Sequence, residues 1–144
     1  MKQYKDMPSI LKSIELENFK CFKTPVKIDF EKLTIITGKN SSGKSSLLYS
    51  ILGTLQSKKF PFLYSPNGKY VNMGDFKEIS NNHNPNNIVQ LGLTFKAFKN
   101  TPPISIKSYW DNNKLNGLPQ LKSLIASCDY FNLSIERKRD KYYV

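Results

Sequence analysis

The sequence is poor in the residues that build disulfide scaffolds, zinc sites and arginine-rich lids. Its 144 residues include two cysteines and one histidine. Cys21 and Cys128 show no CxxC or Cys/His spacing, which argues against both zinc and a disulfide framework and predicts reduced, part-buried thiols. His83 lies in an asparagine-rich stretch without a second candidate ligand, so we interpret it as a turn residue. The arginines are Arg137 and Arg139, so the arginine-rich lid expected of a small nucleotide kinase is missing.

Long apolar runs are also missing. No stretch approaches the roughly 20 apolar residues that a membrane-spanning helix needs. The first 13 residues, MKQYKDMPSILKS, contain no apolar core of signal-peptide length and carry an acidic residue. The sequence alone therefore predicts a cytoplasmic protein without membrane contact.

Acidic residues are few relative to basic ones. The chain has 22 lysines and arginines against 11 aspartates and glutamates, a formal net charge of +11. Such an excess attracts polyanions, so DNA is a possible partner. A solvated lysine-rich surface is the alternative interpretation, because only ERKRDK at 136–141 is a dense cluster. With 39% hydrophobic residues, the chain has enough apolar material for one folded domain over residues 1–144.

The spacing of apolar residues predicts strands, one helix and further strands. Alternation predicts strands at 13–19 and 25–30, and the continuous apolar run at 32–37 predicts a strand covered on both faces. Helical spacing predicts a helix over 44–57 with a buried stripe of Leu47, Leu48, Ile51, Leu52 and Leu55. Further strands are expected at 88–95 and 104–110 and within 121–137, with a polar loop at 81–87 and hairpin turns at Asn67-Gly68 and 111–117. The predicted fold class is α/β with a large antiparallel component.

The ten residues TGKNSSGKSS at 37–46 match the phosphate-binding pattern G-x-x-x-x-G-K-[ST]. Gly38 and Gly43 permit backbone angles and close approaches that a Cβ would obstruct. The amides from Asn40 to Ser45 are then expected to wrap the β-phosphate at the positive pole of the helix. Lys44 is the charge that bridges the β- and γ-phosphates, and Ser45 offers a hydroxyl ligand to Mg²⁺.

The alternative is a glycine-serine turn that merely caps the helix, with Ser41 or Ser42 as the N-cap residue. The context favours the phosphate loop, because an apolar run enters the motif and an amphipathic helix leaves it. We therefore predict a partial P-loop NTPase that takes ATP and Mg²⁺.

Hydrolysis needs further groups that this sequence does not supply clearly. A second strand must end in an acidic residue near Mg²⁺, and another group must position the attacking water. The nearest candidate is SLIASCD, which ends at Asp129, but Ser127 and Cys128 interrupt the apolar run. An ordinary antiparallel strand is the preferred interpretation there. Asp75 is the other candidate, and it lies in a predicted turn.

Residues 10–98 resemble the N-terminal part of the ABC-type ATPase heads of the SMC, RecF and OLD group. The resemblance rests on NFKCF at 18–22, on GKNSSGKS at 38–45, and on NGKYVNMGDFKEI at 67–79. The last stretch is similar to one in bacterial predicted ATPases related to the OLD proteins. The resemblance implies an ATP-binding head that dimerises head-to-tail and acts in DNA maintenance or anti-phage defence.

The resemblance also implies that the NFKCF turn lies near the adenine and ribose, which places Lys20, Phe22 and Lys23 close to the base. Core packing is the alternative for the two phenylalanines and is preferred for Phe19. The predicted cofactor-binding residues are Lys20, Phe22, Gly38, Lys39, Asn40, Ser41, Ser42, Gly43, Lys44, Ser45 and Ser46.

The second lobe of that family, with its signature serine, Mg²⁺-holding acid, catalytic glutamate and switch histidine, has no match in this sequence. Gln56 and Gln90 are poor candidates for the lid-side glutamine. We therefore expect an ATP-binding lobe that does not hydrolyse ATP alone and that forms a homodimer or binds a partner chain supplying the second lobe. A truncated chain, a remnant gene and one half of a split ATPase stay open. The alternative function is a basic nucleic-acid-binding module with a vestigial phosphate loop.

Overall fold

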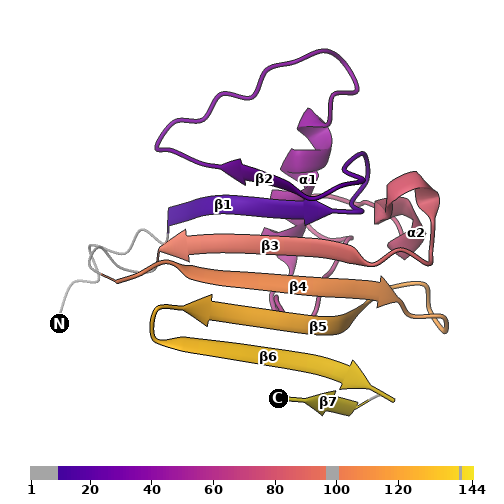
Figure 1. Cartoon of the computed structure of the whole chain (residues 1–144). Coiled ribbons are helices and arrows are strands. Elements are labelled where there is room, and N and C mark those ends of the chain that lie inside the picture. Colours follow the sequence, from indigo (N-terminus) through magenta and orange to yellow (C-terminus); the bar gives the residue numbers. More distant parts are fainter. Residues whose placement is uncertain (1–9, 97–100, 140) are drawn as a thin grey trace.

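A computed structural model describes residues 10–96, 101–139 and 141–144. These residues form one seven-stranded antiparallel sheet with the order β2-β1-β3-β4-β5-β6-β7. The main helix, α1, lies against one face of the sheet, and the short helix α2 lies beside one end of it (Figure 1). The elements are β1 (Ile10–Glu17), β2 (Val26–Asp29), α1 (Lys44–Gln56), α2 (Phe76–Ile79), the 3₁₀ turn η1 (Asn81–His83), β3 (Val89–Lys96), β4 (Ile104–Asn112), β5 (Pro119–Cys128), β6 (Phe131–Lys138) and β7 (Lys141–Tyr143).

The alternating strands place one apolar face of the sheet against the helix. Ile14 pairs with Leu93 and Leu16 with Leu91 between β1 and β3, and Ile14 and Leu16 are buried in the core. Because successive side chains point to opposite faces, the polar residues between them lie on the other face. The large antiparallel component is confirmed, and so are the strands predicted at 13–19, 25–30, 88–95, 104–110 and within 121–137.

Trp110 joins the chain after α1 to the sheet. Its indole Nε1 donates a hydrogen bond to Ser108 Oγ at 3.0 Å, and that hydroxyl donates to the carbonyl oxygen of Leu91 at 3.0 Å. The ring centroids of Phe60 and Tyr64 lie 6.4 and 5.8 Å from that of Trp110. A fully buried indole with its N–H satisfied fixes the segment that follows α1.

The strand predicted at 32–37 is wrong. This segment is irregular and exposed, with 78% of Leu33 and 76% of Ile35 accessible. A strand that is apolar on both faces needs a neighbouring strand and a covering layer on each face. Among the described residues, every strand pair is antiparallel and none involves this segment. The predicted strand–loop–helix unit therefore lacks its strand among the described residues, whereas its helix α1 and the antiparallel sheet are present.

The helix predicted at 44–57 is confirmed, but its buried stripe is different. Leu47, Ser50 and Gly53 are the buried residues of α1, whereas Leu48 and Leu55 are exposed at 51% and 67%. A Cβ at Gly53 would lie 2.5 Å from Tyr64 Oη and 2.7 Å from Met73 Cε. Glycine therefore lets the following loop pack directly on the helix, which turns the two leucines away from the core.

The hairpin turn predicted at Asn67-Gly68 forms slightly later in the chain. The amide of Gly68 donates to the carbonyl oxygen of Val71 at 3.0 Å, so Lys69 and Tyr70 are the central residues of the turn. Gln56 Oε1 accepts from the amides of Tyr70 and Val71, both at 3.1 Å. The Gln56 side chain thus holds this loop in place. The other predicted turn, at 111–117, joins β4 to β5 as expected.

No helix in the described ranges combines the length and apolar character that crossing a membrane requires. The interpretation of the first 13 residues as lacking a signal peptide rests largely on residues 1–9, which lie outside the described residues. The basic cluster at 136–141 includes one such residue, at position 140.

Candidate functional site

The glycine-serine loop at 38–43 adopts a conformation that its sequence favours. Gly38 and Gly43 have φ angles of 149° and 95°, where glycine is the least strained residue, whereas Ser41, at 63°, adopts a left-handed angle without being glycine. A Cβ at Gly43 would lie 2.8 Å from Cys21 Sγ and 3.2 Å from the Phe22 ring. Glycine at position 43 is therefore required both by the backbone angle and by the close approach of the 18–22 turn.

The N-terminus of α1 is open. Gly43 is the N-cap residue, and within the described part of the chain no side chain caps the helix and no acidic residue stands in its first turn. Neither Ser41 nor Ser42 acts as the cap, so the helix-capping alternative is not realised. The first amides of a helix lack partners within it and carry the positive end of the dipole. This end of α1 is therefore suited to an anion.

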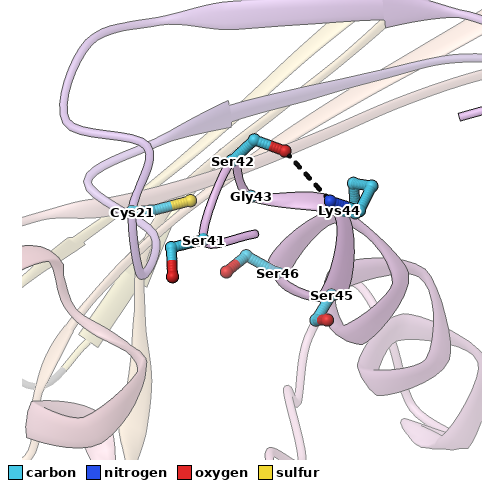
Figure 2. A pocket seen from close by; sticks show the side chains of 7 residues that line it. All are labelled: Cys21, Ser41, Ser42, Gly43, Lys44, Ser45 and Ser46. Carbon is cyan, nitrogen blue, oxygen red and sulfur yellow. Dashed lines mark hydrogen bonds between the residues drawn. The ribbon is translucent and has the colours of Figure 1, made fainter. Parts of the chain in front are cut away.

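The Lys44 side chain folds back into the loop. Its ammonium donates hydrogen bonds to the carbonyl oxygens of Lys39 at 2.6 Å and Gly38 at 2.8 Å. A third, to Ser42 Oγ at 3.3 Å, is drawn in Figure 2. These bonds keep the positive charge at the loop without neutralising it, since carbonyl and hydroxyl groups carry no net charge.

A hollow of about 260 Å³ lies at this end of the helix and is lined by Ser41 to Ser46 and by Cys21. Figure 2 shows the Cys21 thiol reaching toward the loop from the opposite side. Cys21 is exposed rather than part-buried as predicted, whereas Cys128 is part-buried. Gly38, Lys39 and Asn40 are exposed and do not line the hollow. The structure thus brings six of the nine predicted loop residues to one concave surface.

The NFKCF turn lies beside the loop, because Cys21 lines its hollow and Phe22 approaches Gly43. Phe19 is fully buried in the core, and Phe22 packs against the core while touching the position of Gly43. Lys20 is part-buried, and its ammonium donates to the carbonyl oxygen of Glu78 at 3.3 Å. Burial lowers the pKa of Lys20, while the nearby Glu78 carboxylate raises it to a smaller extent.

A second hollow, of about 540 Å³, lies on the other side of Cys21. Its lining includes Lys20 and, from α2 and η1, Glu78, Asn82 and His83. The sequence indicated a turn residue at His83 and gave no reason to distinguish Glu78 or Asn82. The available signal was the polar stretch NNHNPNN, whose composition indicated only a loop.

Neither of the two candidate hydrolytic acids, Asp75 and Asp129, lines the hollow at the loop. Asp129 is exposed in the turn that joins β5 to β6, and Asp75 caps α2 by accepting a bond from the amide of Glu78 at 3.0 Å. The preferred interpretation of SLIASCD as an antiparallel strand is confirmed. Across the described ranges, no three His, Cys, Asp or Glu side chains gather closely enough to hold a metal ion.

Comparison with known proteins gives one result that bears on this site. A family model described as "AAA ATPase domain" matches residues 10–143. A search of curated proteins finds no match for the chain.

Proposed function

The chain belongs to the AAA ATPase domain family, and on that premise we propose that residues 38–46 bind the triphosphate of ATP together with Mg²⁺. The observation that carries the proposal is the uncapped N-terminus of α1 with the Lys44 ammonium beside it. Backbone donors, a helix dipole and one mobile cation are the groups that a P-loop offers to phosphate.

Each loop residue has a separate task in this proposal. The amides of residues 40–45 bind phosphate oxygens, and Lys44 leaves the carbonyls of Gly38 and Lys39 to bridge the β- and γ-phosphates. Ser45 lies in the first turn of α1 and lines the hollow, so its hydroxyl is the proposed protein ligand for the Mg²⁺ that the triphosphate carries.

The groups needed for hydrolysis are proposed to come from outside residues 1–144. Three surfaces support this: the exposed 32–37 segment, the exposed Leu48 and Leu55 of α1, and the apolar groove between α1 and the sheet that Ile51, Leu93 and Phe95 help to line. We infer that an apolar strand of a second lobe pairs with 32–37, because that segment has the composition of a strand covered on both faces. The role in DNA maintenance or defence that the resemblance implies is likewise a proposal.

Nucleic-acid binding is the second candidate function, and one feature favours it. Exposed aromatic side chains stand at both ends of β6: Tyr142 and Tyr143 of β7 pair with Arg137 and Glu136 near its end, and Tyr130 and Phe131 lie at its start. Aromatic faces combined with lysines suit single-stranded nucleic acid. However, Arg137 pairs with Asp111 and Lys138 with Glu136, so part of the basic cluster is neutralised within the protein. We therefore rank this function second.

Calorimetric titration with Mg-ATP tests the ranking. Lys58→Ala, which removes an exposed lysine beyond α1, is the control and is expected to bind Mg-ATP as the wild type does. Lys44→Ala is expected to lose about 100-fold in affinity, because it removes a charged hydrogen-bond donor to phosphate. An equal loss in both variants would point to general charge rather than a site. No Mg-ATP binding by the wild type, together with salt-sensitive binding of single-stranded DNA, would favour the second candidate.

A further inference from the structure

We propose that a hollow at the end of β4 binds a guanine nucleotide, whose base donates to Asp111 and Asn112 and whose phosphate binds Lys114 and Lys122. This strand-end hollow measures about 450 Å³ and is lined by residues 85–88 together with these four. It shares no lining residue with the hollow of the loop. The proposal therefore concerns a separate site and does not depend on ATP binding at residues 38–46.

Two oxygen atoms at this hollow lack hydrogen-bond donors. Asp111 Oδ1 and Asn112 Oδ1 are buried, and neither accepts a hydrogen bond from the described residues. Such atoms are uncommon, because a buried acceptor that has lost its bonds to water is costly unless another donor replaces them. Since both residues line the strand-end hollow, a ligand with two N–H donors would satisfy both atoms.

The Asp111 carboxylate is held in place by Arg137. The Arg137 guanidinium donates from Nη2 to Asp111 Oδ2, and 14% of the Arg137 side chain is exposed. This pairing offsets the charge of the carboxylate and leaves Oδ1 as an acceptor. With Lys114 and Lys122 also at the hollow, the local charge is positive, which disfavours a metal ion and favours uncharged N–H donors.

The two lysines supply binding groups for an anion. Lys114 is exposed and Lys122 is part-buried, and neither forms an ion pair with the described residues. Lysine ammonium groups bind phosphate oxygens through charge and hydrogen bonds. A nucleotide joins uncharged N–H donors to a phosphate, and the volume of the hollow lies within the range of about 300–1,000 Å³ that is typical of ligand clefts.

Guanine is the base whose donors match the two acceptors. Its Watson–Crick edge carries two adjacent donors, N1–H and the N2 amino group, whereas the same edges of adenine and cytosine carry one amino group each. The guanine O6 and N7 atoms are acceptors that lysine commonly binds. Side chains read the Watson–Crick edge where the base is unpaired, so the ligand is a free guanine nucleotide or a guanine in a single strand.

Tyr142 distinguishes these two sources. Its hydroxyl donates to the carbonyl oxygen of Leu121, next to Lys122 in the sequence, at 3.1 Å, and 49% of the residue is exposed. In a single strand, a base beside the guanine would stack on this ring. A free nucleotide has no second base, so Tyr142 contributes to binding of a strand alone.

Calorimetric titrations with two matched ligand pairs test the proposal. The first pair is guanosine and adenosine monophosphate, and the second is a single-stranded thymidine oligonucleotide with and without one central guanine. Asp111→Asn keeps an oxygen for Arg137 but places N–H donors against those of the base. Asp29→Asn is the matched control, because it makes the same change in a β2 aspartate that pairs with Lys27 at 3.5 Å. Thermal unfolding checks folding, and Asn112→Ala is a second variant that removes the other acceptor.

We expect the wild type and Asp29→Asn to bind the guanine member of a pair at least about tenfold more tightly than its partner. Asp111→Asn and Asn112→Ala should reduce this preference to within about twofold. A preference confined to the oligonucleotides and weakened by Tyr142→Ala assigns the guanine to a strand, whereas a preference for guanosine monophosphate that Tyr142→Ala leaves unchanged assigns it to a free nucleotide. No guanine preference in either pair, or one that both Asp111→Asn and Asn112→Ala retain, would overturn the proposal.

Discussion

The Lys44 ammonium donates a hydrogen bond at 2.6 Å to the carbonyl oxygen of Lys39, inside the loop that precedes its own helix. The carbonyl oxygen of Gly38 accepts a second bond at 2.8 Å. The loop thus holds its cation close to where phosphate charge would arrive. A phosphate carries negative charge that the two carbonyl oxygens lack, and Coulomb attraction between opposite charges strengthens its bond to the ammonium. We therefore expect the ammonium to exchange the carbonyls for the nucleotide.

Gly43→Ala should damage the loop in two ways. The φ angle of 95° disfavours any Cβ, and the added carbon would lie 2.8 Å from Cys21 Sγ. We expect a loss of about 1–3 kcal/mol in the free energy of unfolding, measured with urea, and at least a tenfold weaker affinity for Mg-ATP.

Gly117→Ala is the matched control for that variant. Gly117 has a φ angle of 69°, but its nearest neighbour would lie 3.9 Å from a new Cβ. It should therefore lose stability through backbone strain alone and keep its nucleotide affinity. Wild-type binding by Gly43→Ala would show that the loop tolerates a different shape.

Tyr64→Phe should stabilise the protein. The Tyr64 side chain is 2% exposed, and its hydroxyl has no hydrogen-bond partner in the described part of the chain. Removing an unsatisfied buried hydroxyl should add about 1 kcal/mol to the free energy of unfolding. Tyr70→Phe, at a position that is 54% exposed, should change it by less than about 0.5 kcal/mol. A destabilised Tyr64→Phe would mean that the hydroxyl is satisfied.

The same residue predicts a pH dependence. Burial raises the pKa of Tyr64 in the folded state, whereas an unfolded tyrosine titrates near about 10. Above that pH the unfolded chain releases a proton that the folded protein retains, so stability falls as the pH rises past about 10. Between pH 8 and 11, urea unfolding should show that Tyr64→Phe loses less free energy of unfolding than the wild type. Equal losses would contradict the raised pKa of Tyr64.

Ile35→Lys should leave the chain folded. Ile35 is 76% exposed, so a lysine there should change the free energy of unfolding by less than about 0.5 kcal/mol. Ile14→Ala, in the core, should cost about 2–5 kcal/mol. The lysine should also weaken binding of the proposed second lobe. If the surface instead joins two copies of the chain, light scattering should show that the lysine converts a dimer to a monomer. A strongly destabilised Ile35→Lys would show that the segment packs in the core.

The isolated chain should turn over ATP at a negligible rate. Asp75 is engaged as a helix cap and Asp129 is exposed in a hairpin turn, so neither occupies the place of a hydrolytic acid. Phosphate release measured with 1 mM Mg-ATP should match the background without protein. Sustained turnover that Asp129→Asn abolishes would reverse this conclusion.

The local pattern was enough to predict the strands around Ile14, Leu91 and Leu133, because alternation reports directly which face of a strand is buried. The left-handed angles at Gly38 and Gly43 could be expected from the motif, because its glycines are the residues that adopt them most easily, while the binding role of the loop stays a prediction. The sequence wrongly predicted a strand at 32–37, since an apolar run becomes a strand only where another strand pairs with it. Within the described residues, no strand pairs with 32–37.

The second hollow illustrates a further limit of the sequence. Glu78 and Lys20 are 58 residues apart, and only the packing of α2 against the β1–β2 turn brings them together. Gly53 shows the same limit in the core. Its sequence context indicates a weakened helix, whereas its contacts with Tyr64 and Met73 show a glycine required for close packing.

The central claim is that the N-terminus of α1 binds the triphosphate, and alkylation of Cys21 tests it most directly. Cys21 is exposed and lines the hollow of the loop, and Cys128 at the end of β5 is an internal reference. With iodoacetamide and peptide mass spectrometry, we predict that saturating Mg-ATP slows modification of Cys21 at least about fivefold, as expected for a thiol that a ligand covers, and leaves Cys128 unchanged. Bound nucleotide with an unchanged rate at Cys21 would place ATP elsewhere and contradict the account.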